Sequence, residues 1–95
     1  MDKTADPNII ENADGSVTVK FDDRPLKIDG TAVKSLNMRE PTVNDQLVAR
    51  KSGLGDEEAE VNMIANLCEL PPDAVRGMTM RQYVRLQEAL AGFMS

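Results

Sequence analysis

The sequence has no histidine, no tryptophan, a single cysteine and only three aromatic residues. Without histidine, the side chain that most often exchanges protons near neutral pH is missing, and Ser–His and Cys–His nucleophile pairs are excluded. The single cysteine, Cys68, cannot form a disulfide within the chain, which favours a reducing compartment. Cys68 precedes Glu69 near an expected helix C-terminus, where a thiolate is disfavoured, so we interpret it as a core residue.

Long apolar runs are also absent from the sequence. A transmembrane helix needs about 20 predominantly apolar residues in a row, and no segment approaches that length. The first seven residues lack the apolar core of a secretory signal peptide. We therefore expect a protein that stays in the cell that makes it and does not bind a membrane.

Basic residues are fewer than acidic ones, 11 against 16, and the formal net charge is −5 at pH 7. An acidic surface is repelled by the phosphates of nucleic acid and permits a basic protein partner. Two expected helices between Thr42 and Leu70 could form a helix-turn-helix, but the second begins with the acidic run at 56–60. That run would face the major groove, so we expect no binding to nucleic acid.

Carboxylate pairs at Asp22-Asp23 and Glu57-Glu58 are the remaining candidates for catalysis. Both pairs fall at the ends of expected elements in polar surroundings, whereas catalytic carboxylates need burial or a close like charge to raise their pKa. The acidic run at 56–60 lacks the pattern of a calcium-binding loop and suits the start of a helix. No glycine-rich phosphate-binding motif occurs. We therefore expect no enzyme, no metal site and no cofactor.

Alternating apolar residues indicate β-strands in the N-terminal half of the chain. Residues 1–12 are expected to form a flexible arm, with a short extended piece at Ile9-Ile10. Residues 16–38 are expected to form a β-meander with a hairpin turn at Asp29-Gly30. The apolar residues expected on one face are Val17, Val19 and Phe21 in the first strand, Leu26 and Ile28 in the second, and Leu36 and Met38 in a third from Val33 to Met38.

Helix signals occupy residues 42–94. Thr42 and Asp45 have the spacing of a capping box, and Thr79 and Gln82 repeat it at the start of the last helix. The other signals are an apolar stripe of Val43, Leu47 and Val48, a helix start at Asp56, and a short helix from Asp73 to Arg76 with Pro72 at its first turn and Gly77 at its end. We predict one α+β domain over residues 1–95, with a small antiparallel β-meander of two or three strands followed by three or four packed α-helices.

The last expected helix has apolar residues on more than one side. One apolar stripe is enough to pack the helix on the sheet, so the remaining apolar residues are a surplus. We expect Val84, Leu86 and Leu90 to be core residues, as most apolar helix positions are. Methionine and phenylalanine near the helix ends are free to contact another chain, and methionine adapts well to binding surfaces. The candidates for partner binding are Met80, Tyr83, Leu86, Leu90, Phe93 and Met94. Self-association through this helix is a further expectation.

Four segments occur in an order that resembles a known family. They are Pro25 to Gly30, with the pattern Pro-Leu-x-Ile-Asp-Gly; Arg39 to Asp45, with the pattern Arg-Glu-Pro-Thr-x-x-Asp; a leucine and proline break from Leu67 to Asp73; and the helix start from Met80 to Tyr83. Over residues 17–94 the chain resembles the Mu-like group of phage tail assembly chaperones, from contractile-tailed phages and prophages. Asn44 stands where the family pattern has glycine, and Gln82 where it has aspartate, but Gln82 keeps the capping chemistry.

The resemblance implies a non-catalytic role in virion morphogenesis. It implies that the partner is the phage tape measure protein, which is kept soluble until tail tube subunits polymerise around it; the tail tube protein is a second candidate partner. The resemblance also implies that the chain acts in the host bacterial cytoplasm and is absent from the mature virion. Relatives are often made in two forms, the longer by a ribosomal frameshift, and this chain would match the shorter form.

Two other interpretations stay open at this point. The chain could be a small phage or bacterial regulator that acts by binding nucleic acid or another protein, which electrophoretic mobility with duplex DNA would reveal. It could also be a hydrolase that uses its paired carboxylates. Alanine substitutions at Asp22, Asp23, Glu57 and Glu58 would then remove a measured turnover.

Overall fold

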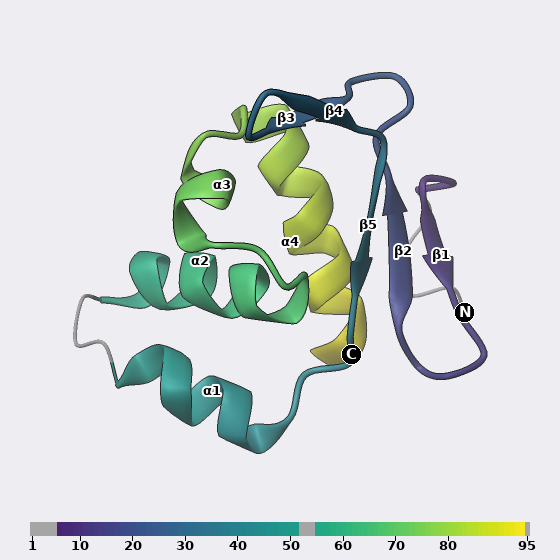
Figure 1. The fold of residues 1–95 in the computed structure, drawn as a ribbon. Coiled ribbons are helices and arrows are strands. Elements are labelled where there is room, and N and C mark those ends of the chain that lie inside the picture. The colour runs from purple at the N-terminus through teal and green to yellow at the C-terminus, as the bar shows by residue number, and fades with distance from the viewer. Residues whose placement is uncertain (1–5, 52–54, 95) are drawn as a thin grey trace.

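The computed structural model describes residues 6–51 and 55–94, apart from the side chain of Met94. Within these residues, five short strands precede four helices, so the α+β class predicted from the sequence is confirmed (Figure 1). The strands are β1 (Ile9–Glu11), β2 (Val17–Lys20), β3 (Leu26–Ile28), β4 (Thr31–Val33) and β5 (Ser35–Met38). The helices are α1 (Val43–Arg50), α2 (Asp56–Leu67), α3 (Pro72–Arg76) and α4 (Met80–Met94).

The strands form one three-stranded sheet and one separate hairpin. β2 lies in the middle of the larger sheet and pairs antiparallel with both β1 and β5. Val19 lies opposite Ile9 on one side and Leu36 on the other, which places three buried apolar side chains next to one another on one face. β1 includes Ile9 and Ile10, the short extended piece expected in the N-terminal arm.

β3 and β4 form the separate hairpin, and its turn has the predicted chemistry. Asp29 and Gly30 both have positive φ, 53° and 79°, as a two-residue type I′ turn requires. Aspartate tolerates this conformation and glycine adopts it without a steric penalty, so these two residues fix the register of the hairpin.

The strand expected from Val33 to Met38 is divided at Lys34, because its two parts pair with different partners. The Arg24 N–H donates to the Phe21 carbonyl at 3.0 Å, in a turn that takes the chain out of the larger sheet after β2. The Phe21 N–H donates to the Lys34 carbonyl at 2.6 Å, where the chain returns. The β3–β4 hairpin is therefore inserted in the chain between β2 and β5, which pair with each other. The simple meander order, in which each strand pairs with the next one in the sequence, was wrong for this part of the chain.

Helix boundaries follow the predicted signals closely. Thr42 Oγ1 accepts from the Asp45 N–H at 3.2 Å, and Asp45 Oδ2 accepts from the Thr42 N–H at 2.8 Å, which completes the predicted capping box of α1. α2 begins at Asp56, and α3 has Pro72 in its first turn and Gly77 at its C-cap, also as predicted.

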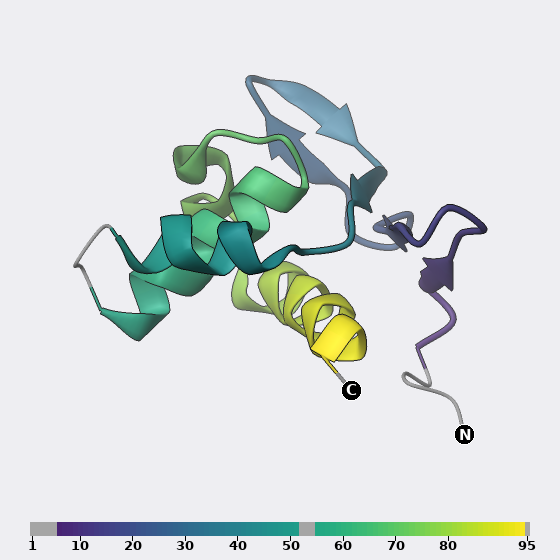
Figure 2. The ribbon, with the colours of Figure 1, turned by 90° about the horizontal axis from the view of Figure 1, so that it is seen from below.

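The helices cover one face of the larger sheet (Figures 1 and 2). α4 packs against β2, α2 packs against α4 and β5, and α1 and α3 lie on the outside, each against α2. The largest fully buried side chains, which fill the core between these layers, are Val19, Phe21, Leu26, Met38, Ile64, Leu67 and Leu86. Among the helices described, none is long and apolar enough to cross a membrane.

Candidate partner-binding surface

The candidate residues from the middle of α4 onward lie mainly in the core. Leu86 is fully buried, and Leu90 and Phe93 are partly buried against the core cluster. Leu86 therefore has no surface to offer a partner in this conformation, while Leu90 and Phe93 offer a part of their side chains. The side chain of Met94 lies outside the part of the chain that the structure describes.

The N-terminal half of α4 is more exposed. Met80 is 67% exposed and Val84 is 41% exposed, although both are apolar. Tyr83 is partly buried against the core. Of the candidates whose side chains are described, Met80 thus presents the most apolar surface, and Val84, which we had assigned to the core, adds to it.

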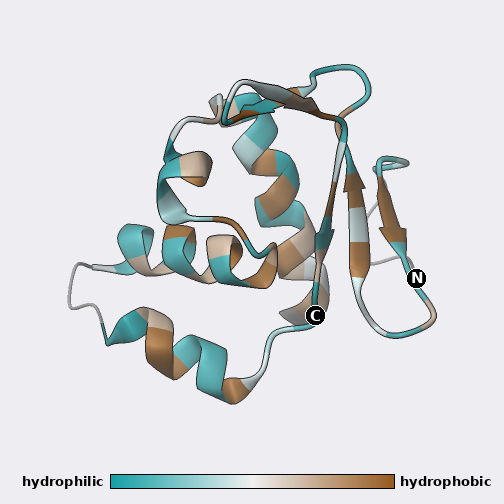
Figure 3. Ribbon diagram, viewed as in Figure 1, coloured by the Kyte–Doolittle hydropathy of each residue, from teal (hydrophilic) through white to brown (hydrophobic). Residues whose placement is uncertain are grey.

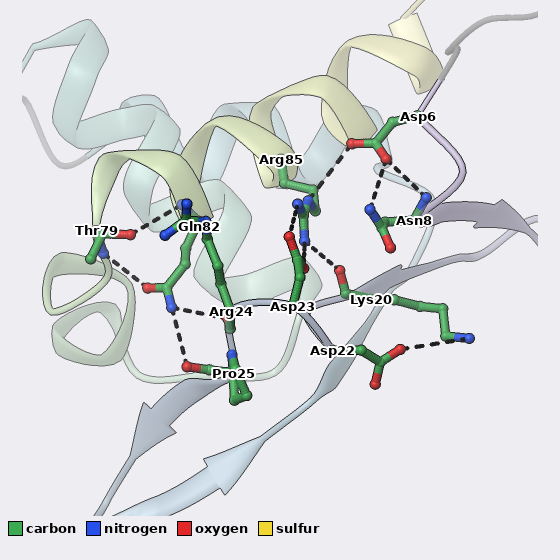
Figure 4. A network of polar contacts seen from close by, with 10 residues as sticks. All are labelled: Asp6, Asn8, Lys20, Asp22, Asp23, Arg24, Pro25, Thr79, Gln82 and Arg85. Carbon is green, nitrogen blue, oxygen red and sulfur yellow. Dashed lines mark hydrogen bonds and ion pairs between the residues drawn. The ribbon is translucent and has the colours of Figure 1, made fainter.

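Polar contacts fix the start of α4 against the chain between β2 and β3 (Figure 4). Gln82 Oε1 accepts from the Thr79 N–H at 3.0 Å, and Thr79 Oγ1 accepts from the Gln82 N–H at 3.2 Å, so the second predicted capping box is confirmed. Gln82 Nε2 also donates to the carbonyls of Arg24 and Pro25, both at 3.2 Å. This second role of Gln82 depends on residues far away in the sequence, so the spacing alone did not reveal it.

Arg85 holds the middle of α4 to the N-terminal segments (Figure 4). Its Nη1 donates to the Lys20 carbonyl at 2.8 Å and to Asp23 Oδ1 at 3.0 Å, and its Nε lies 3.7 Å from Asp6 Oδ2. Its guanidinium lies 5.4 Å from the centre of the Phe21 ring. The hydrogen bond from Arg85 holds the pKa of Asp23 below its ordinary value. These contacts fix the rotation of α4 and thereby decide which of its apolar residues face outward.

A groove of about 290 Å³ lies between α2, α3 and α4, beside the exposed Met80. We call it the α4 groove. Its apolar lining residues are Val61, Val75, Met78, Met80 and Tyr83, and its polar lining residues are Glu57, Glu60, Arg76 and Gln87. An apolar groove of this kind, bordered by polar groups, is the usual receptor for the apolar side of a helix.

The polar residues of the α4 groove contact one another. The Tyr83 hydroxyl donates to Glu60 Oε1 at 2.6 Å, and Gln87 Nε2 donates to the same oxygen at 2.8 Å. Burial of Tyr83, together with the nearby Glu60 carboxylate, raises the pKa of Tyr83 above its ordinary value, so the hydroxyl remains a donor. Arg76 Nη2 lies 2.7 Å from Glu58 Oε2. Glu60, Gln87 and Arg76 are thus paired within the chain, and the flexible methionines are left to adapt to a partner.

The apolar stripe expected on α1 faces solvent rather than the core. Val43, Leu47 and Val48 are 78%, 62% and 55% exposed, and they account for the strongly hydrophobic segments of α1 in Figure 3. We call these three residues the α1 face. An apolar helix stripe ordinarily packs inward, so the spacing identified the stripe but could not show its direction.

Asp45 and Ala49 are the buried residues of α1, and the carboxylate of Asp45 fixes the direction of the helix through its hydrogen bonds. Arg39 Nη1 and Nη2 donate to its two oxygens at 2.7 and 2.8 Å, and Asn66 Nδ2 on α2 donates to it at 3.1 Å. The hydrogen bonds from Arg39 and from the Thr42 N–H hold the pKa of Asp45 well below its usual range. The carboxylate therefore stays ionised, faces α2 and turns the α1 face outward. The pairing of Arg39 with Asp45, six positions apart, was the signal that the sequence offered.

The other chemically reactive groups take structural roles. Burial raises the pKa of the Cys68 thiol to about 12, so the thiol keeps its proton, as its apolar position predicted. Asp22, Asp23 and Glu58 each lie beside a basic side chain. Within residues 6–51 and 55–94, no three metal-ligating side chains come together in a possible metal site.

Comparison with known families agrees with this architecture. A family model described as phage tail assembly chaperone proteins, E, or 41 or 14, matches residues 18–95. The chain therefore belongs to this family of phage tail assembly chaperones, and the resemblance drawn from its motifs is confirmed. Membership implies a role in the host during phage assembly, with protein partners, and indicates a non-enzymatic function. Comparisons with curated proteins and with solved structures gave no match.

Proposed function

We propose that this chain is a non-catalytic tail assembly chaperone that binds the phage tape measure protein and keeps it soluble during tail morphogenesis. The observation that carries the proposal is the α4 groove, whose apolar lining ends at a methionine that is 67% exposed. Val84, one helical turn after Met80, is also 41% exposed, so the two side chains continue the apolar lining of the groove onto the surface. Continuous exposed apolar surface, unlike a single exposed side chain, is typical of a site that binds a partner.

The shape and chemistry of the α4 groove suit an apolar stripe on a helix. Three helices form its walls, and Met78 and Met80 can change rotamer to follow different side chains along one partner. A long helical client would present many similar apolar stripes, none of them identical. Adaptable methionines therefore serve a chaperone better than a rigid pocket would.

The proposal includes where and when the chain acts. It binds the tape measure protein in the host cytoplasm and leaves before the tail is complete, so it is absent from the mature virion. The tail tube protein is a second candidate partner, because its subunits replace the chaperone around the client. The overall charge of −5 keeps the chaperone and the complex soluble.

Co-expression with the tape measure protein encoded by the same phage tests the proposal. The soluble fraction of the tape measure protein is measured with and without this chain, and the chain is tagged so that complexes can be recovered. We expect the soluble amount to rise several-fold and the two proteins to co-purify. Equal solubility in both cultures, together with no co-purification, would refute the function proposed.

A further inference from the structure

A second hollow, on another part of the molecule, differs from the α4 groove in size and charge. It measures about 160 Å³ and lies between the β1–β2 region and the last turns of α4. We call it the acidic hollow. Its apolar lining residues are Ile9, Val17, Ala89 and Phe93, and the carboxylates that border it are Glu11, Glu40 and Glu88. None of these three carboxylates forms a salt bridge or a side-chain hydrogen bond with another described residue.

The acidic hollow has room for a single side chain rather than for a helix. An apolar lining with carboxylates at its border suits lysine or arginine, whose apolar stem packs on carbon while its charged end reaches an acid. The occupant is therefore a cationic side chain that projects from an apolar surface, because the hollow offers both kinds of contact.

The same chain carries a surface of this description. Lys51 is the C-cap of α1 and keeps helical backbone angles, φ −64° and ψ −19°. It follows Leu47 by four positions and Val48 by three, so it projects from the side of the helix that carries the α1 face. Lys51 is exposed and makes no salt bridge with a described residue. The neighbouring Arg50 only approaches Asp56, at 3.5 Å, in an exposed pair of little strength.

Lys51 cannot fill the acidic hollow of its own chain. Glu40, at the border of the hollow, precedes α1, whereas Lys51 follows it, and the C-terminal end of α1 lies on the opposite side of the molecule from β1 (Figure 1). A contact between the two surfaces must therefore join two molecules.

We propose that α1 of one copy of this chain docks onto the acidic hollow of a second copy, with the Lys51 side chain in the hollow and the α1 face over its apolar border. Charge complementarity selects the second copy. In a chain with net charge −5, the α1 face ends in two cations and the hollow is bordered by three carboxylates. The contact covers a small area, so the association is weak and concentration-dependent. It is independent of the α4 groove and leaves that groove open to a client.

Sedimentation equilibrium of the full chain at several concentrations tests the proposal, with Lys51→Glu and Glu88→Lys as the two variants. We expect the wild type to associate reversibly, and each variant to associate at least about tenfold more weakly, because each places like charges in contact. Raising the salt concentration should weaken the wild-type association, since the contact is formed by charges at the surface. Lys27→Glu makes the same charge change as Lys51→Glu at a position away from both surfaces and should associate like the wild type.

Mixing the two variants gives the decisive result. A Glu88→Lys molecule still has Lys51, and a Lys51→Glu molecule still has an intact hollow, so an equimolar mixture should form a one-to-one heterodimer although neither variant associates alone. A wild type that stays monomeric, or variants that associate normally, would overturn the proposal. So would a mixture that stays monomeric while the wild type associates, since this would mean that α1 pairs with another surface. Co-purification with the tape measure protein is read separately, so either proposal can fail while the other stands.

Discussion

Arg39 and Asp45 form a two-pronged ion pair, 2.7 and 2.8 Å long, in which the arginine is partly exposed and the carboxylate is almost fully buried. The pair joins the end of β5 to the first turn of α1, and the same carboxylate caps the helix at Thr42. One side chain therefore sets both where α1 begins and which way it faces.

Replacing Asp45 by alanine should lower the free energy of unfolding by about 2–3 kcal/mol, because it removes the cap and leaves Arg39 and the Thr42 N–H without their partner. Chemical denaturation followed by circular dichroism measures the change. Asp56→Ala is the control, since Asp56 is highly exposed and its pair with Arg50 is long. Equal effects of the two substitutions would mean that the buried pair contributes no more than a surface one.

The stability that Asp45 contributes should depend on pH in a defined direction. The pKa of Asp45 is held below its usual range in the folded chain, so the unfolded chain takes up a proton first as the pH falls. The contribution is fully present above the unfolded value, about pH 4, and is lost as the pH falls below it towards the folded value. We expect the difference in unfolding free energy between wild type and Asp45→Asn to shrink below about pH 4. A difference that is constant from pH 7 to pH 2 would show that ionised Asp45 has no special role.

Gln82 should prove a better residue for this chain than the aspartate that the family pattern has there. Gln82→Asp keeps an acceptor for the Thr79 N–H but is too short, and lacks the donor, to reach the carbonyls of Arg24 and Pro25. We expect Gln82→Asp to cost about 1 kcal/mol and Gln82→Ala somewhat more. Thermal unfolding of both variants checks the order. An aspartate variant as stable as the wild type would show that the hydrogen bonds to the Arg24 and Pro25 carbonyls contribute no net stability.

Cys68 should be unreactive in the folded protein. Burial raises the pKa of its thiol to about 12, so at pH 8 almost none of it is thiolate and the sulfur is shielded from reagents. A chromogenic disulfide reagent should label the native chain slowly and the chain unfolded in guanidinium at once. Equally fast labelling of native and unfolded protein would contradict the buried position.

The sequence was sufficient to predict those parts of the fold that depend only on residues close together in the chain. The hairpin turn at Asp29-Gly30 and the capping boxes at Thr42 and Thr79 need only residues within a few positions of each other. The pairing of β2 with β5 could not be read in this way. It depends on the hairpin leaving the sheet and returning at Lys34, which is a matter of contacts distant in sequence.

In the candidate binding surface, too, the sequence indicated the features that depend on nearby residues but not those that depend on distant contacts. The sequence placed Met80 among the partner candidates because it lies at the start of a helix that is apolar on more than one side, and the structure exposes it. It also kept Leu86 among the candidates, although Leu86 was expected to be a core residue, and the rotation of α4 fixed by Gln82 and Arg85 buries Leu86 completely. The outward direction of the α1 face was missed for a similar reason, because it depends on the burial of Asp45.

The central claim is that the α4 groove binds the tape measure protein, and Met80→Glu tests it most directly. Glutamate suits the first turn of a helix, so the variant should fold, but it places a charge where the apolar groove meets its client. Ala91→Glu is the matched control, because it adds the same charge to an exposed position on the same helix. The amount of soluble tape measure protein that co-purifies with each tagged variant is the measurement. We expect it to fall at least about tenfold with Met80→Glu and to stay unchanged with Ala91→Glu. Recovery with Met80→Glu equal to that of the wild type would contradict the account.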